Sequence, residues 1–253
     1  MSGLIIPDGK ATGCLPRERK PGDVCGSYRD AFIIYSVDDL VDRIREIDQL
    51  TNGQGLKQFV ADIYNQDGVG SCSSESANGC FAATRVAEGQ EHVAFNPWGT
   101  YHFTSGGRDQ GSTLYDNLVS LQQRGAVRDE LWPRYDSSGR VVHSWRERPS
   151  QEALDDAQRF RLGEFWELRN VAELASAYVD GFGCVYGWSG HSCWIPYLHP
   201  STTNQVSQWV ATYANSWDES WGDNGYGTIR LGEINWSYQA FAYRTSRTWV
   251  DAA

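Results

Sequence analysis

The sequence predicts an α+β fold in which the N-terminal half is mainly helical and the C-terminal half is mainly strand. Apolar residues recur every three or four positions in several segments before residue 125, as in amphipathic helices. From residue 183 onward, runs rich in aromatic and branched residues alternate with turn clusters, as in strands. A chain of 253 residues can form two lobes around a shared cleft, and we expect the cleft where the halves meet.

The helical half is predicted from apolar periodicity and from capping residues. The clearest helix covers 37–50, where the apolar residues form one stripe and NGQG at 52–55 ends it. A second helix follows Cys72 with Ser71 as its N-cap, and a third runs from about 113 to 124 before Gly125. Shorter helical signals lie near 151–160 and 170–179. Residues 1–56 are expected to be an N-terminal extension with one amphipathic helix, packed beside a domain over 57–253.

The strand-rich half is predicted from five short runs of aromatic and branched residues. These runs lie at 184–188, 192–198, 206–214, 226–231 and 240–250. Turn residues separate them at intervals typical of antiparallel strands. We therefore expect a helical lobe over about 57–165 and an antiparallel β-rich lobe over about 166–253.

Composition and charge exclude several classes of function. The formal net charge is −10 and the basic residues are scattered, which argues against a nucleic-acid partner. No apolar run approaches the roughly 20 residues of a membrane span. The first residues lack the basic and apolar regions of a secretory signal. A soluble protein with no membrane partner and no export signal is expected.

Two sequence blocks, 143 residues apart, carry the chemistry. The first is NQDGVGSC at 65–72, which ends in Cys72 and has Gln66 six residues earlier. The second is NSWDESWGDNGYG at 215–227, which begins with Asn215. Between them, His191 lies in the sequence SGHS. A Gln, a Cys, a His and an Asn are the side chains that a thiol acyl-transfer enzyme needs.

Each of these residues has a chemical role that its local sequence supports. A thiol becomes nucleophilic when its pKa falls, and the predicted helix start at Cys72 favours a thiolate. His191 would act as base and then as acid, held in orientation by Asn215. Gln66 and the backbone N–H of Cys72 would stabilise an oxyanion. Any one of these residues alone is more often structural; their joint order and spacing favour catalysis.

The sequence resembles the papain-like cysteine peptidases over roughly 57–232. The blocks at 65–72 and 215–226 resemble the Gln-to-Cys block and the Asn-Ser-Trp block of that family, and Gly190-His191 resembles its catalytic His step. The resemblance implies a papain-like two-lobed fold with Cys72, His191, Asn215 and Gln66 as catalytic residues. It also implies that a bound peptide is contacted by Gly70, Ser71, Gly111, Ser112 and Trp217, with Trp217 screening the His–Asn hydrogen bond.

The sequence departs from the family pattern around the nucleophile. Val69 stands where the family has a Cys, and the usual disulfide partner of that Cys falls at about Asp109, so both halves of the bridge are absent. SSE at 73–75 follows the nucleophile in place of the usual Trp and Ala. The carboxylate of Glu75 would raise the thiol pKa if it faced Cys72. No segment resembles a full inhibitory pro-region, which leaves open whether residues 1–56 cover the cleft.

Several alternatives remain open from the residues alone. His199 is the main rival of His191, and His191 is favoured because Gly190 precedes it and a strand-like run follows. The pairs Cys14–Cys25 and Cys184–Cys193 could be disulfides or free thiols. Cys184, His191, Cys193 and His199 match no common zinc spacing, so we expect neither a metal nor another cofactor. His92, His102 and His143 are expected to be surface or structural residues.

The expected function is hydrolysis of a peptide or related amide through a thioester acyl-enzyme, with a peptide or protein as substrate. A non-catalytic structural or binding protein that keeps the same scaffold is the first alternative. A cell-wall peptide amidase with the same triad is the second. The chain resembles the short, disulfide-free bacterial or bacteriophage versions of the family that lack a pro-region. A virion-associated role with protein assembly partners belongs to the non-catalytic alternative, and the sequence leaves the compartment open between cytoplasmic and virion-associated.

Overall fold

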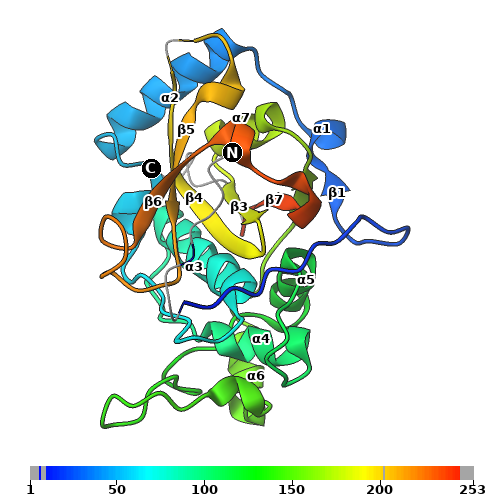
Figure 1. Ribbon diagram of the computed structural model, residues 1–253, viewed down its shortest axis with the longest axis vertical. Helices are drawn as coiled ribbons and strands as arrows, with labels where there is room; N and C mark the ends of the chain where they lie inside the picture. The colour runs from blue at the N-terminus through cyan, green and yellow to red at the C-terminus, as the bar shows by residue number, and fades with distance from the viewer. Residues whose placement is uncertain (1–5, 7–9, 202, 246–253) are drawn as a thin grey trace.

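A seven-stranded sheet and a group of helices beside it make up the protein (Figure 1). The computed structural model describes residues 6, 10–201 and 203–245. The strands are β1 (Gly26–Ser27), β2 (Phe165–Leu168), β3 (Gly183–Trp188), β4 (His191–His199), β5 (Val210–Ala214), β6 (Tyr226–Arg230) and β7 (Ala240–Tyr243). Their order across the sheet is β1-β2-β7-β3-β4-β5-β6, and every neighbouring pair is antiparallel except β1 with β2.

The α-helices fall into two groups in space. Those of the described chain are α1 (Tyr28–Ala31), α2 (Val37–Thr51), α3 (Cys72–Ala87), α4 (Pro97–Ser105), α5 (Leu114–Arg124), α6 (Gln151–Ala157) and α7 (Val171–Val179). Helices α3 to α6 form the lower part of the molecule in Figure 1, whereas α1, α2 and α7 lie with the sheet. This is the α+β, two-lobed arrangement expected from the sequence.

The sheet register brings the two halves of the candidate site together. Strands β3 and β4 form a hairpin around Ser189 and Gly190, both with positive φ, so that His191 pairs with Trp188. Strand β5 pairs with β4 and ends at Ala214, opposite Trp194. The residue after β5, Asn215, therefore lies near the start of β4.

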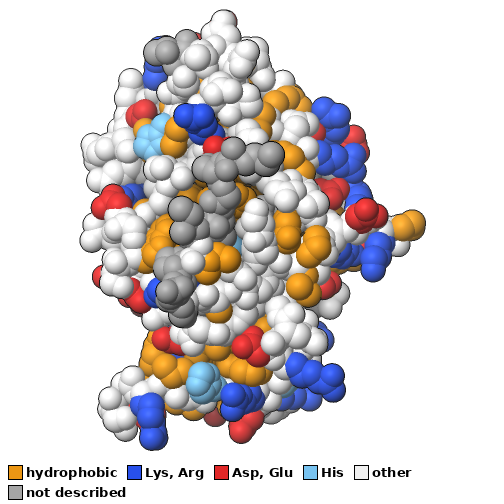
Figure 2. Space-filling model, viewed as in Figure 1, with side chains coloured by type: hydrophobic (Ala, Val, Ile, Leu, Met, Phe, Trp, Pro, Cys, Tyr) orange, Lys and Arg blue, Asp and Glu red, His pale blue; other side chains and the backbone are white. Residues whose placement is uncertain are grey.

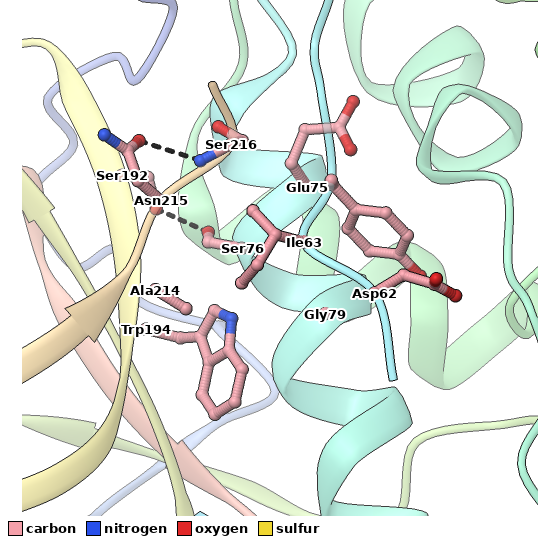
Figure 3. A pocket seen from close by; sticks show the side chains of 11 residues that line it. Asp62, Ile63, Glu75, Ser76, Gly79, Ser192, Trp194, Ala214, Asn215 and Ser216 are labelled. Atoms are coloured by element: carbon pink, nitrogen blue, oxygen red, sulfur yellow. Dashed lines mark hydrogen bonds between the residues drawn. The ribbon is translucent and has the colours of Figure 1, made fainter. Parts of the chain in front are cut away.

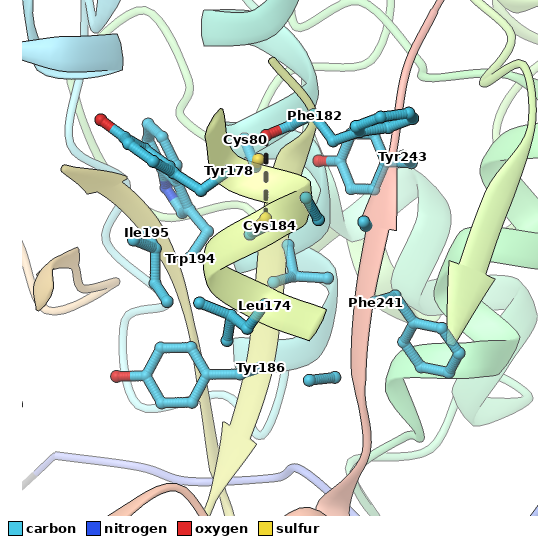
Figure 4. Close-up of a cluster of buried hydrophobic side chains, with 14 of the residues drawn as sticks. Cys80, Leu174, Tyr178, Phe182, Cys184, Tyr186, Trp194, Ile195, Phe241 and Tyr243 are labelled. Carbon is cyan, nitrogen blue, oxygen red and sulfur yellow. Dashed lines mark hydrogen bonds between the residues drawn. The ribbon is translucent and has the colours of Figure 1, made fainter. Parts of the chain in front are cut away.

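The main hydrophobic core lies between the sheet and the helices on its two faces. Helix α3 packs on β3 and β4, and α7 packs on β3 and β7. Figure 4 shows part of this core, formed by residues of α3, α7, β3, β4 and β7: Cys80, Leu174, Tyr178, Cys184, Tyr186, Trp194, Ile195, Phe241 and Tyr243. Leu40, Ile44 and Ile47 of α2 belong to the same cluster. The N-terminal extension therefore shares its core with the domain that follows.

The structure confirms most of the predicted elements and changes several bounds. The predicted helices at 37–50, after Cys72, at 113–124, 151–160 and 170–179 are all present. The run at 206–214 divides into a 3-10 turn, Val206–Gln208, and β5. The last strand ends at Tyr243 rather than 250, and 246–250 lie outside the described residues. Helix α4 was not predicted because it is buried on most sides and shows no apolar stripe, although Asn96 caps it and Pro97 begins it.

The surface carries charges of both signs. On the face shown in Figure 2, acidic and basic side chains are interspersed, and apolar side chains gather toward the lower end. Within the described chain, no helix combines the length and the apolar character that crossing a bilayer requires.

The shared core predicts that the N-terminal extension unfolds together with the rest of the chain. Ile44→Ala removes a fully buried side chain of α2, so we expect the free energy of unfolding to fall by about 2–5 kcal/mol. Arg45→Ala, an exposed neighbour in the same helix, should change it by no more than about 0.5 kcal/mol. Urea unfolding followed by tryptophan fluorescence checks this, because the first tryptophan is Trp98, outside the extension. An unchanged fluorescence midpoint in Ile44→Ala would contradict it.

Candidate active site

Cys72 is the first residue of α3, at the point where the helix meets the sheet. The backbone N–H groups at a helix start have no partners within the helix, so they are available to a negative group. The backbone N–H groups of Ser73, Ser192 and Gly13 face the sulfur and lower the pKa of the Cys72 thiol. Burial outweighs them and raises that pKa well above its ordinary value.

His191 and Asn215 are joined by a buried hydrogen bond. The distance from His191 Nε2 to Asn215 Oδ1 is 2.7 Å. The same Oδ1 accepts the backbone N–H of Ser216 at 2.8 Å. An N–H group can only donate, so the atom at this position is an oxygen and His191 Nε2 must be the donor. The neutral ring therefore carries its lone pair on Nδ1, which is buried and has no hydrogen-bond partner among the described residues.

Trp217 covers the imidazole of His191. The two rings stack with centroids 4.6 Å apart and an angle of 25° between their planes. Trp217 is fully buried and packs edge-on against Trp221 of the same block. This stacking keeps water from the His191–Asn215 hydrogen bond, which strengthens it.

Gln66 is held between the two lobes. Its Oε1 accepts the hydroxyl of Ser216 at 2.7 Å, and its backbone N–H donates to the carbonyl of Ser216 at 3.0 Å. One hydrogen of its Nε2 goes to the carbonyl of Val69 at 2.6 Å. An amide carries two such hydrogens, so one remains to donate to a developing oxyanion.

Residues 10–15, which we call the strap, lie across this site. The N–H groups of Gly13 and Cys14 both donate to the carbonyl of Gly190, at 3.0 and 2.8 Å. Ser112 pairs with the strap in a parallel bridge, accepting from Leu15 N at 3.0 Å and donating to Gly13 O at 2.8 Å. In Figure 1 the strap is the start of the dark-blue segment, which crosses the lower end of α3 and continues toward α5.

The strap fits because Gly13 has no side chain. A Cβ at Gly13 would come within 2.0 Å of the carbonyl oxygen of Gly70, and one at Gly111 within 2.5 Å of the carbonyl oxygen of Gly13. The thiol of Cys14 enters the space beside Gly187 and Tyr238. The sequence left open whether the extension covers the cleft; its strap does so.

The covered site holds its titratable groups in neutral forms near pH 7. Burial lowers the pKa of His191 from 6.5 to about 4, although the hydrogen bond to Asn215 partly opposes the shift. Burial also raises the pKa of Cys72, and the nearby Cys14 raises it further. The structure therefore describes a thiol and a neutral imidazole rather than an ion pair.

Glu75 does not act on Cys72 in the way that its sequence position suggested. Its carboxylate accepts the hydroxyl of Ser71 at 3.0 Å and lies 3.9 Å from the guanidinium of Arg134. Burial raises the pKa of Glu75 to about 7, whereas Arg134 and Ser71 act to lower it. This buried pair joins α3 to the loop after α5. Nothing in the sequence pattern signals it, because 59 residues separate its members.

Hydrogen bonds connect the loop before Cys72 to Asp109, close to the two positions at which the family resemblance places a disulfide that this chain lacks. The backbone N–H of Gly70 donates to Asp109 Oδ1 at 2.8 Å, and the Tyr101 hydroxyl donates to the same oxygen at 3.0 Å. Val69 is buried in a small cluster with Trp98, Tyr101 and Trp145. The loop before the nucleophile is therefore fixed without a covalent link.

The remaining candidate residues differ in where they lie relative to the strap and to Cys72. Gly70, Gly111 and Ser112 line the strap. The side chain of Ser71, by contrast, turns away from the cleft toward Glu75 and Trp98. His199 lies at the far end of β4, hydrogen-bonded to Thr212 at 2.7 Å, away from Cys72.

The cysteines and potential metal ligands form no further site. All six thiols are free and buried. Cys184 and Cys193 lie on neighbouring strands but pair with Ile195 and Tyr186 rather than with each other. Within residues 10–201 and 203–245, no group of three or more His, Cys, Asp or Glu side chains could hold a metal ion.

A small pocket lies behind Asn215, between α3 and strands β4 and β5. Glu75, Ser76, Ser192, Asn215 and Ser216 line its polar part (Figure 3). Its volume is about 10 Å³, which is room for about one water molecule. The hydroxyls of Ser76 and Ser192 bond across it at 2.6 Å and join the lobes. A peptide cannot enter a pocket of this volume.

Solved structures similar to this chain are papain-like cysteine proteases. Xylellain, a cysteine protease from Xylella fastidiosa, aligns with a TM-score of 0.69 and 15% identity over 96% of this chain and 100% of its own. Digestive procathepsin L 3 of Tenebrio molitor larval midgut aligns with a TM-score of 0.59 and 12% identity, over 93% of this chain and 76% of its own. Procathepsin B S9 from Trypanosoma congolense aligns with a TM-score of 0.59 and 11% identity, over 93% of this chain and 87% of its own. No protein-family model matches the sequence, and no curated protein matches it. The chain has a papain-like fold.

The steric fit of Gly13 predicts that a side chain there displaces the strap. Gly13→Ala should increase the rate of Cys72 alkylation by iodoacetamide at pH 7 at least about fivefold, because overpacking by one methyl group costs about 1 kcal/mol or more. Lys20→Ala is the matched control, since Lys20 is an exposed residue of the same N-terminal extension outside the strap. Mass spectrometry of the alkylated peptide measures both rates. Equal rates in the two variants would show that the strap does not limit access.

The low pKa of His191 predicts a dependence of stability on pH. Between pH 6.5 and about 4 the unfolded chain binds a proton at this ring that the folded chain does not. The free energy of unfolding should therefore fall as the pH is lowered through this range, by up to about 1.4 kcal/mol per pH unit. Urea titrations at several pH values, compared with His191→Gln, isolate this contribution. Identical slopes in both proteins would mean that His191 is not held neutral.

Proposed function

From the papain-like fold, we propose that this chain hydrolyses peptide or related amide bonds through a thioester acyl-enzyme. Cys72 is the nucleophile, His191 the general base and then the general acid, and Asn215 the residue that orients the ring. Gln66 and the backbone N–H of Cys72 stabilise the oxyanion. A peptide or protein is the substrate, and no metal or cofactor takes part.

The observation that carries this proposal is the hydrogen bond from His191 Nε2 to Asn215 Oδ1. That oxygen also accepts the N–H of Ser216, so its identity and the tautomer of the ring follow from donor and acceptor chemistry. The lone pair is then on Nδ1, the nitrogen that is not held by Asn215. An imidazole with this tautomer can accept the proton of a thiol.

Acylation follows from these roles. Nδ1 takes the proton of Cys72, and the sulfur attacks the carbonyl carbon of the scissile amide. The carbonyl oxygen becomes an oxyanion, and the free N–H of Gln66 with the N–H of Cys72 stabilises it. When the carbon–nitrogen bond breaks, His191 gives the proton to the leaving amine, and a thioester remains.

Deacylation uses the same groups with water as the nucleophile. His191 removes a proton from the water, which attacks the thioester carbonyl, and the oxyanion forms again at the same donors. Its collapse breaks the carbon–sulfur bond and releases the carboxylic acid. The proton held by His191 returns to the sulfur, so the enzyme is regenerated without net change.

Release of the strap is required for this cycle. The strap contacts Ser112, where the peptide backbone is expected to bind, it donates to the carbonyl of Gly190, and its Gly13 N–H faces the sulfur. When the strap leaves, water reaches Cys72 and His191 and the cost of charging them by burial falls. A thiolate–imidazolium pair can then form.

A non-catalytic scaffold is the second candidate, and the occupied cleft is the observation that favours it. A strap that never leaves would keep the thiol neutral and closed to substrate. Selective alkylation of Cys72 among the six thiols near neutral pH supports the enzyme, whereas equally slow alkylation of all six supports the scaffold.

Replacement of the nucleophile is the direct test of the hydrolase. Cys72→Ala should lower peptide hydrolysis at least about 10³-fold, because it removes the thiol that is proposed to form the thioester. Its thermal unfolding should remain close to that of the parent chain. Cys25→Ala, which removes a buried thiol that has no part in the proposed mechanism, should keep full activity. Fluorogenic peptides measure the rates, and turnover that survives in Cys72→Ala would overturn the proposal.

A further inference from the structure

The side chain of Lys10 is bound at one end of the cleft. Its Nζ donates to the carbonyl of Trp217 at 3.0 Å and lies 3.4 Å from Asp218 Oδ2. The indole N–H of Trp217 donates in turn to the carbonyl of Ala11 at 3.1 Å. A basic residue of the strap thus occupies a position formed by one carboxylate and one backbone carbonyl.

Asp218 is fixed in place independently of Lys10. Its Oδ1 accepts the backbone N–H of Ser220 at 2.7 Å, and its Oδ2 accepts Nδ2 of Asn65 at 3.3 Å. Its φ is +62°, a left-handed conformation that disfavours side chains other than glycine. The Oδ1 atom of Asp218 is occupied by the turn hydrogen bond from Ser220, whereas its Oδ2 atom faces Lys10. An acceptor held in advance loses little entropy when it binds a cation.

The position of Lys10 is on the leaving-group side of the cleft. In the proposed reaction His191 gives its proton to the departing amine, so the amine half of the substrate lies beside the imidazole. Trp217 stacks on that imidazole and carries the carbonyl that binds Lys10. The strap reaches the sulfur three residues later, at Gly13, and then Ser112. The order along the cleft is therefore Asp218, Cys72, Ser112.

The two chain segments that carry Asp218 and its partner Asn65 are acidic in sequence. Two segments that meet at the Asn65–Trp217 bridge, 62–70 and 215–225, contain five carboxylates and no Lys or Arg: Asp62, Asp67, Asp218, Glu219 and Asp223. Tyr135 donates to Asp67, and His92 lies 4.0 Å from Asp62. Arg134 lies over the ring of Tyr64 in the first segment and pairs with Glu75.

We propose that Asp218 and the carbonyl of Trp217 form a subsite for a basic side chain on the leaving-group side of the scissile bond. This inference rests on the proposed peptidase function and names its substrate class, peptides with Lys or Arg about two to four residues after the cleaved bond. Lys10 fills the subsite in the covered form and must leave it before such a peptide binds.

The expected preference is modest and depends on salt. Lys10 and Asp218 are partly exposed, with side-chain exposures of 27% and 35%, so water and ions screen their attraction. A peptide with Lys at the preferred position should have a kcat/KM about two- to fivefold higher than the Ala peptide at low salt. The ratio should approach one near 1 M NaCl.

The test scans Lys, Ala and Glu through the four positions after the scissile bond of one fluorogenic peptide. Three full-length proteins are compared: the parent chain, Asp218→Asn and Glu219→Gln. Asn keeps an oxygen for the Ser220 N–H and removes the charge, and Glu219→Gln removes an equal charge from an exposed neighbour. The proposal predicts a Lys preference that is lost in Asp218→Asn and kept in Glu219→Gln. No preference, or an equal loss in both variants, overturns it.

A binding measurement separates this proposal from the proposed function. Each peptide is added during alkylation of Cys72 by iodoacetamide, and its protection of the thiol gives an affinity without turnover. Protection by Lys peptides that Asp218→Asn weakens, without hydrolysis, would support the subsite and contradict the peptidase. Hydrolysis with equal protection by Lys and Ala peptides would support the peptidase and contradict the subsite.

Discussion

The site depends on one hydrogen bond, from the imidazole of His191 to the amide oxygen of Asn215. The bond exists because the β3–β4 hairpin and the pairing of β4 with β5 place the two residues side by side. The donor in this bond is the ring N–H of His191, because the Asn215 oxygen also accepts the N–H of Ser216. Trp217 then covers the ring. The tautomer of His191 is thus a consequence of sheet register and backbone polarity.

The two lobes are held together by polar contacts, so the oxyanion side and the imidazole side form one network. Gln66 bonds to Ser216 through both its backbone and its side chain, and Ser76 bonds to Ser192. Asp109 and the Glu75–Arg134 pair fix the loop and the helix that carry the nucleophile. The strap makes the thiolate of Cys72 and the imidazolium of His191 harder to form, because it keeps both groups away from water.

The sequence was sufficient for the elements and residues that have a local signal. Helix α2 follows from its apolar stripe, and Cys72 and Asn215 follow from two specific blocks. Other features have no local signal. Helix α4 lacks a stripe because most of its residues are buried, and the strap is held mainly by backbone groups that every residue possesses, with Lys10 as its one side-chain ion pair among the described residues. Only Gly13, whose missing side chain permits contact with Gly70, marks that segment. The Glu75–Arg134 pair requires knowledge of the tertiary contact itself.

The state of the His191 ring is the most direct test of this account. A ¹⁵N–¹H correlation spectrum of the side chain distinguishes a protonated Nε2 from a protonated Nδ1. The account predicts a neutral ring with hydrogen on Nε2 and a lone pair on Nδ1 from pH 8 down to about pH 5, because burial lowers its pKa to about 4. Hydrogen on Nδ1 of the neutral ring, or titration near the ordinary pKa of 6.5, would contradict it.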